Sequence, residues 1–148
     1  MGNFVFNIAK GKVKWYVEQV DGSGNERLVL IPLESSGLES DATLIDKDDV
    51  AAVLSGTTNE QTTAGRKTIS SATTTVNDTS DRWEGDFADQ TYTAIAASNA
   101  IAQWVVAFDA DTTSGNDSNL IPLTCNVLAW TPDGNNFTVQ VADFVRSI

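Results

Sequence analysis

The run Trp104-Val105-Val106-Ala107-Phe108 is the most hydrophobic stretch in the second half of the chain. Polar loop residues bound it on both sides, which is typical of a strand that is buried on both faces. We therefore expect a central strand at 104–108. Thr, Ser, Asn and Asp are frequent elsewhere, whereas Lys, Glu and Leu are scarce. This composition favours strands joined by turns over helices.

The first third of the chain carries a second set of strand patterns. Apolar residues alternate at period two over 4–8, which predicts a first strand. Alternation over 12–20, a break at 21–25 and an apolar run over 27–33 together predict a hairpin. We expect the first of these strands to anchor the N-terminal segment.

Later segments repeat the strand-and-turn pattern. The polar stretch 57–81 predicts either two modest strands or one long exposed hairpin, and 94–102 offers a turn of helix as an alternative to strand. The turn at Asp133-Gly134 lies between two alternating runs and is the strongest hairpin signal in the chain. The remaining expected strands cover 67–69, 73–76, 82–87, 91–95, 120–130 and 137–145.

One short helix is expected at about 46–55. Asp46 is placed to cap it, an apolar stripe includes Val50 and Val53, and Gly56 suits its C-terminal end. The length of 148 residues is that of one ordinary domain. The sequence therefore predicts a mainly β chain in which residues 1–148 form one antiparallel β-sandwich or barrel-like domain.

Charge is unevenly distributed along the chain. Twenty acidic residues against nine basic residues give a net charge of −11, which disfavours nucleic acid and anionic membranes as partners. Lys10, Lys12 and Lys14 nevertheless fall in a segment, residues 1–14, that contains no acid. This segment is expected either to approach an acidic partner as a strand or arm, or to blunt a sheet edge with lysines.

Most known site chemistries lack their residues. The chain contains no histidine and one cysteine, Cys125, which excludes histidine-dependent catalysis, internal disulfides and thiolate metal clusters. No phosphate-binding loop, dinucleotide fingerprint, secretory signal or membrane-spanning run is recognised. We expect no catalytic residue, no cofactor and no metal ligand, and therefore no enzyme.

Two weaker patterns remain. Glu84 and Asp86 beside Trp83 are the best candidate pair for a carboxylate-dependent hydrolase, but the solvent-facing side of an amphipathic strand is the favoured interpretation. The loop 109–119 resembles a calcium loop without the third acid and the bidentate glutamate of an EF-hand, so an ordinary turn is favoured there.

Aromatic residues are expected mainly in the core. Trp104 and Trp130 lie in runs that indicate burial, whereas Trp83 follows a polar stretch and is the candidate for an exposed interface anchor. The candidate partner contacts are therefore Phe4, Phe6, Lys10, Lys12, Lys14 and Trp83.

Several motifs resemble those of small proteins encoded in the virion modules of tailed bacteriophages. The motifs lie at 3–11, 36–44, 58–62, 109–124 and 131–134, and so span nearly the whole chain. Such proteins are usually encoded near the major capsid protein. The resemblance implies a capsid decoration or cement protein that is made in the host cytoplasm and binds the major capsid protein on the outer capsid surface.

The same resemblance leaves a second role open. A receptor- or glycan-binding module of a tail or head fibre would also suit a surface rich in Thr and Asn. Self-association, most plausibly as a trimer, is implied by analogy with decoration proteins and by no residue of this chain.

Overall fold

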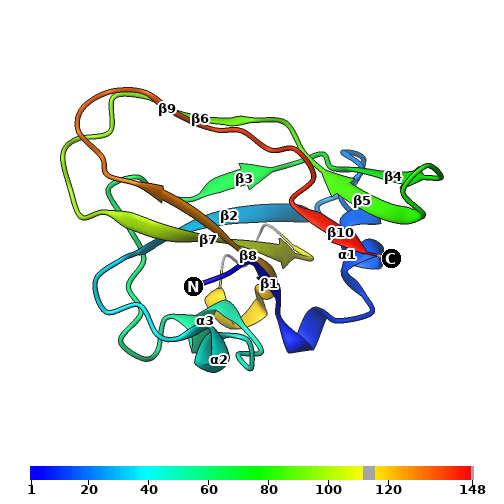
Figure 1. The fold of residues 1–148 in the computed structure, drawn as a ribbon, viewed down its shortest axis with the longest axis horizontal. Helices are drawn as coiled ribbons and strands as arrows, with labels where there is room; N and C mark the ends of the chain where they lie inside the picture. Colours follow the sequence, from blue (N-terminus) through cyan, green and yellow to red (C-terminus); the bar gives the residue numbers. More distant parts are fainter. Residues whose placement is uncertain (112–115, 148) are drawn as a thin grey trace.

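The central strand expected at 104–108 is present. In the computed structural model, which describes residues 1–111 and 116–147, β7 (Ile101–Asp109) is buried along its whole length. It pairs antiparallel with β2 (Arg27–Glu34) on one side and with β8 (Ile121–Trp130) on the other. This strand is the middle of the largest sheet (Figure 1).

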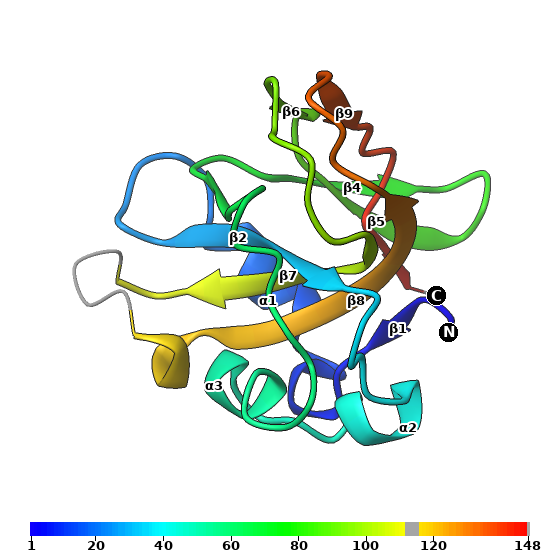
Figure 2. The same ribbon diagram turned by 90° about the vertical axis from the view of Figure 1, so that its left-hand side faces the viewer.

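Three antiparallel sheets make up the described part of the chain (Figures 1 and 2). The five-stranded sheet has the order β1-β8-β7-β2-β3, with β1 at Phe4–Val5 and β3 at Lys67–Ile69. The three-stranded sheet has the order β10-β5-β4, with β10 at Val145–Ser147, β5 at Arg82–Asp86 and β4 at Thr73–Asn77. β6 (Gln90–Tyr92) and β9 (Phe137–Val139) form the third sheet. The expected mainly β, sandwich-like single domain is confirmed.

Two apolar cores lie on opposite faces of the five-stranded sheet, because side chains alternate across a strand. Val105 and Ala107 of β7 pack on the side of α2 (Asp41–Leu44) and α3 (Val50–Val53). Trp104, Val106 and Phe108 pack on the opposite side, against residues of the two smaller sheets. The five-stranded sheet is thus the middle layer, with short helices below it and the smaller sheets above it (Figure 1).

The helix expected at 46–55 is only one turn long. α3 begins after Asp49, whose carboxylate accepts a hydrogen bond from the Ala52 N–H at 2.6 Å, and it ends at Leu54. Asp46, the expected cap, instead accepts a hydrogen bond from the Asn7 side chain. The preceding turn, α2, is capped by Ser40 and was not expected. Several carboxylates compete to cap in this acidic stretch, and the extended backbone of Asp49 determines which one does.

The strand expected at 12–20 is wrong, because this segment forms α1 (Val13–Glu18). Its buried residues are Val13, Tyr16, Val17 and Val20, which have the spacing of one helix face. The first strand is also shorter than expected: β1 ends at Val5, and residues Asn7–Ala9 form the 3-10 turn η1. The predicted hairpin of 12–20 with 27–33 is therefore absent.

One more pairing, at the C-terminal turn, differs from the prediction. The turn at Asp133-Gly134 forms, with Gly134 at φ +92°, but β9 pairs with β6 and not with β8. The stretch 57–81 contains two strands, the first of the two predicted alternatives, and they do not pair with each other, since β3 pairs with β2 and β4 pairs with β5. Residues 94–100 form no helix. The calcium-loop prediction for 109–119 falls partly on 112–115, outside the described residues, and the rest of that loop includes the turn η2 (Asp117–Asn119).

Candidate interaction surface

The edge strands of two sheets face one another across an opening in the fold. β1 is the terminal strand of the five-stranded sheet, and β10 is the terminal strand of the three-stranded sheet. Val5 of β1 and Val145 of β10 line the same pocket. Among the described residues, no hydrogen bond joins β1 or β8 to the segment 140–146. The two sheets therefore do not close into a barrel here.

This opening continues as a groove made of three adjoining pockets. An apolar pocket of about 210 Å³ lies over β7 and β8, and a central pocket of about 280 Å³ lies between β1 and β10. A basic pocket of about 310 Å³ lies between β10 and the loop that precedes α1. Asn126 lines the first two pockets, and Val5 and Arg146 line the last two. We call the three together the groove.

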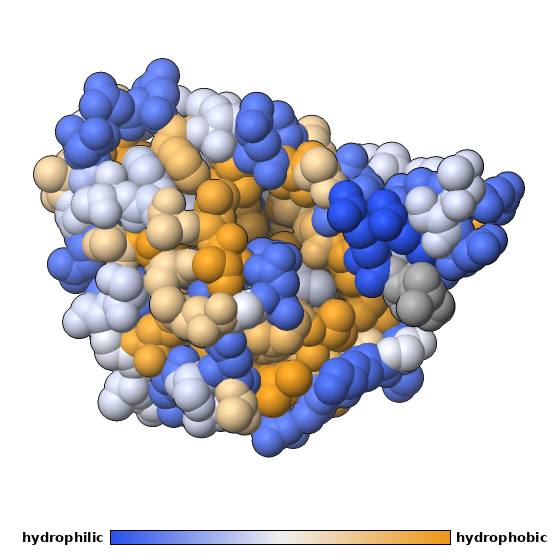
Figure 3. All heavy atoms as spheres, in the orientation of Figure 1, coloured by the Kyte–Doolittle hydropathy of each residue, from blue (hydrophilic) through white to orange (hydrophobic). Residues whose placement is uncertain are grey.

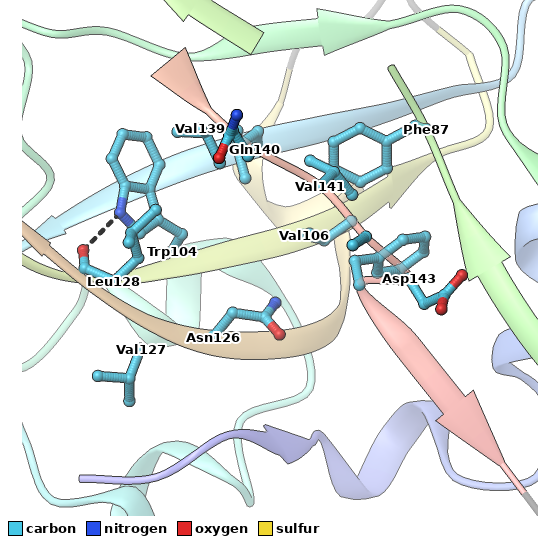
Figure 4. A pocket seen from close by; sticks show the side chains of 13 residues that line it. Phe87, Trp104, Val106, Asn126, Val127, Leu128, Val139, Gln140, Val141 and Asp143 are labelled. Atoms are coloured by element: carbon cyan, nitrogen blue, oxygen red, sulfur yellow. Dashed lines mark hydrogen bonds between the residues drawn. The ribbon is translucent and has the colours of Figure 1, made fainter. Parts of the chain in front are cut away.

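The apolar pocket opens the inner face of the five-stranded sheet to the surface. Trp104 and Val106 form its floor, and Phe87 and Val139 lie at its wall (Figure 4). The Trp104 Nε1 donates a hydrogen bond of 2.8 Å to the Leu128 carbonyl, so this polar group of the floor is already satisfied. Figure 3 shows the apolar surface as a hollow in the middle of the face. A ligand of this pocket should therefore be apolar.

The basic pocket has the opposite character. Lys10, Lys14 and Arg146 line it, and no acidic residue does. Trp83 also lines it, and its buried Nε1 has no hydrogen-bond partner in the part of the chain that the structure describes. Two acids stand nearby on the surface, since Lys14 lies 3.6 Å from Glu18 and Arg146 lies 3.0 Å from Asp143. The Lys14–Glu18 pair is exposed to water, whereas Asp143 is half-buried; the three cations of the pocket still outnumber these two acids and can attract a further carboxylate.

An exposed aromatic side chain directly follows Lys14 of the basic pocket in the sequence. Trp15 of α1 is 55% exposed, although its ring contacts Tyr16 with centroids 5.1 Å apart. Lys12 and Lys14 precede it in the sequence and are exposed as well. A partly supported tryptophan among cations is a common anchor in protein interfaces. We call Lys10, Lys12, Lys14 and Trp15 the basic face.

The structure separates the predicted contacts into three groups. The three lysines are exposed, as a contact role needs. Phe4 is half-buried and lines the central pocket. Phe6 is fully buried in the core and Trp83 is only 8% exposed, so neither can be an exposed anchor. Phe6 is buried because it packs in the core on the side of α2 and α3, and Trp83 is covered because it packs in the opposite core.

The sequence reasoning missed Trp15, Val145 and Arg146. A signal for Trp15 existed, because the helical spacing of Val13, Tyr16 and Val17 leaves Trp15 on the outer face. No local signal existed for the two residues of β10. Their role depends on β10 lying opposite β1, which is a contact between distant segments.

Glu84, the first residue of the candidate carboxylate pair, does not have the environment of an acid catalyst. Arg82 donates a hydrogen bond to Glu84 at 2.5 Å and holds the pKa of that carboxyl below its usual range, although partial desolvation opposes the shift. A general acid in a glycosidase needs a raised pKa. Among the described residues there is also no cluster of three or more His, Cys, Asp or Glu side chains that could hold a metal ion.

Comparison of the chain with models of protein families, with curated proteins and with solved structures finds no match. No helix in the described ranges is long and apolar enough to cross a membrane. The geometry that remains is a groove between two sheet edges, bordered at one end by the basic face.

Proposed function

We propose that this chain is a structural virion protein of the capsid decoration type, which binds the outer capsid surface and stabilises the joints between capsomers. The observation that carries the proposal is the segregation of charge: an acidic chain, with a net charge of −11, presents three exposed lysines in the short segment that precedes the exposed Trp15. The resemblance of its motifs to proteins of phage virion modules supports the same role.

The basic face is built on a fixed support. The buried residues of α1 pack in the core, and α1 contacts β4 and β5. Lys10 and Lys12 flank Gly11, whose φ of +76° places the turn between η1 and α1. A contact surface held in this way loses little conformational entropy when it binds. The partner in this proposal is an acidic region of the major capsid protein.

Binding to virions tests the proposal through charge reversal. Removing residues 2–14 would also remove Phe6 and Val13 from the core, so point substitutions are the better test. The triple substitution Lys10→Glu, Lys12→Glu and Lys14→Glu changes exposed side chains and one exposed ion pair. We expect it to weaken binding to virions stripped of this protein by at least about tenfold, which corresponds to about 1.4 kcal/mol.

The matched control is Thr93→Glu, Ala96→Glu and Ala97→Glu. These residues are exposed and lie in the loop before β7, at the end of the molecule away from α1 (Figure 1). We expect the control to bind as the unaltered protein does, because its added charges are far from the basic face. Equal binding by both triple variants would reject the basic face as the contact.

A glycan- or receptor-binding role in a tail or head fibre is the second candidate, and the exposed ring of Trp15 favours it because aromatic faces pack against sugars. The abundance of the protein in purified virions separates the two roles. A copy number similar to that of the major capsid protein supports decoration, whereas a small fraction of it indicates a tail component.

A further inference from the structure

We propose that the groove binds an extended segment of the partner protein, which lies as an added strand between β1 and β10 and places an acidic side chain in the basic pocket. The inference rests on the proposed function for the identity of that partner. The chemistry of the segment follows from the groove itself, in four steps.

The main chain of β1 is available on the side of the groove. The Phe6 N–H donates to the Leu123 carbonyl of β8 at 3.0 Å, and Phe4 is paired with Cys125 of the same strand. Because main-chain groups alternate in direction along a strand, the N–H and C=O of Val5 point away from β8. Val5 lines both the central and the basic pocket. An added strand would find its hydrogen-bonding partners there.

The opposite wall is also a sheet edge. β10 pairs with β5 on one side only, and its residues Val145 and Arg146 line the central pocket. Free edges of this kind attract further strands, and natural proteins normally cover them. Two such edges across one groove suit an extended peptide, which is the arrangement of β-strand addition.

The floor of the groove determines the side chains of the segment. Successive residues of a strand point to opposite faces. One face of the segment would lie over Trp104, Val106 and Phe144, so alternate residues should be apolar. Asn126 and Asp143 line both the apolar and the central pocket, and their polar side chains are placed to meet the main chain of the segment.

The basic pocket determines the charge. Lys10, Lys14 and Arg146 favour a carboxylate, because no acidic residue lines this pocket. A second copy of this chain does not fit as the occupant. Every strand that the structure describes already pairs with at least one other strand, so none could enter the groove as a single extended segment. The occupant is therefore an unpaired acidic and apolar segment of another protein.

Selection from a random peptide library tests this chemistry without a virion. The probe is an mRNA-displayed library of peptides about ten residues long, enough for one strand with flanking residues. It is selected on the immobilised full chain. We expect the recovered peptides to be enriched in β-branched or aromatic residues at alternate positions and in Asp or Glu near one end.

Three variants locate the binding. Asn126→Trp fills the junction of the apolar and central pockets, and we expect it to weaken the binding of the enriched peptides by at least about tenfold. Ala129→Trp is the matched control, since Ala129 is exposed on the same strand and lines none of the three pockets, and it should leave binding unchanged. Arg146→Glu changes an exposed residue and should remove the preference for acidic peptides. This second variant tests the groove independently if Asn126→Trp does not fold.

The outcomes separate the two proposals. Two results would overturn the groove as the site. One is a set of recovered peptides without acidic enrichment, and the other is peptide binding that survives both Asn126→Trp and Arg146→Glu. Dimerisation of the unaltered chain that Asn126→Trp abolishes would assign the groove to a second copy and overturn it as well. Groove-dependent peptide binding by a protein that does not bind virions would overturn the capsid role alone.

Discussion

Val5 of β1 and Val145 of β10 line one pocket although they belong to the terminal strands of two different sheets. The five-stranded sheet ends at the first of these strands and the three-stranded sheet ends at the second. Their side chains meet a common space, while the described main chains on the two sides exchange no hydrogen bond. This unclosed seam beside the basic face is the feature on which the functional account depends.

Trp15 and Trp104 should respond differently to truncation. Trp104 is 1% exposed and packs near Tyr92 with ring centroids 5.4 Å apart, so Trp104→Ala should lower the free energy of unfolding by about 3–5 kcal/mol. Trp15→Ala should lower it by less than about 1 kcal/mol while weakening virion binding. Urea denaturation measures the first effect. A larger stability loss for Trp15→Ala would show that Trp15 belongs to the core.

Arg66 joins two distant segments of the chain. Its guanidinium lies 2.6 Å from a Glu60 carboxylate oxygen and 2.5 Å from one of Asp117, and both contacts are partly buried. The hydrogen bonds to Glu60 and then to Asp117 raise the pKa of Arg66 above its ordinary value. Arg66→Ala should lower the free energy of unfolding by about 1–3 kcal/mol.

The control for Arg66 is Lys14→Ala, which breaks an exposed pair with Glu18. This change should alter the free energy of unfolding by no more than about 0.5 kcal/mol. Equal effects of the two substitutions in urea titrations would contradict the role given to Arg66.

The thiol of Cys125 should be inert in the folded protein. Burial, followed by the nearby charge of Asp41, raises its pKa to about 12, and the side chain is fully buried in β8. Since the thiolate is the reactive form, a disulfide reagent such as Ellman's reagent should react at mildly alkaline pH only after urea is added. Fast reaction of the native protein would mean that the core on the side of α2 and α3 does not shield Cys125.

The Asp41 carboxylate should make the stability of the folded protein depend on pH in the acidic range. Burial opposes its ionisation, but hydrogen bonds from the Gln103 side chain and the Gly2 N–H outweigh this effect and lower its pKa. Because the pKa is lower in the folded state than in the unfolded state, the carboxylate contributes stability above the ordinary aspartate pKa. That contribution is lost as the pH falls through the lowered value.

Replacement of Asp41 by Asn should therefore lower stability at neutral pH and reduce the additional loss on acidification. Urea midpoints measured at neutral pH and at about pH 3, which is below the ordinary aspartate pKa, give both effects. Asp78→Asn, in the exposed turn between β4 and β5, is the control and should leave the pH dependence unchanged. An unchanged pH dependence in Asp41→Asn would contradict the prediction.

The sequence predicted the strands whose burial is visible locally. β7 follows from an apolar run that is buried on both faces, and β5 and β8 follow from alternation over 82–87 and 120–130. The strand prediction for 12–20 was wrong because the spacing of Val13 and Val17 fits both a strand, with a period of two residues, and a helix, with 3.6 residues per turn. The helix is favoured because Tyr16 and Val20 are buried against distant strands. A short stretch of sequence contains no sign of those contacts.

The groove could not be predicted for the same reason. A local turn at Asp133-Gly134 indicated that the C-terminal strands would pair with β8, but the long-range pairing of β9 with β6 and of β10 with β5 draws them away from it. As a result, β1 and β10 each pair with a strand of their own sheet and do not pair with each other across the seam. The basic face, in contrast, was visible in the sequence as Lys10, Lys12 and Lys14.

Hydrogen–deuterium exchange of the virion-bound protein against the free protein tests the central claim most directly. The account predicts slower exchange on binding in peptides that cover 3–15 and 140–147, because the partner covers the basic face and pairs with β1 and β10. Peptides that cover the loops at 93–100 and 131–136 should exchange as in the free protein. Protection confined to those loops, with none at β1 and β10, would contradict the account.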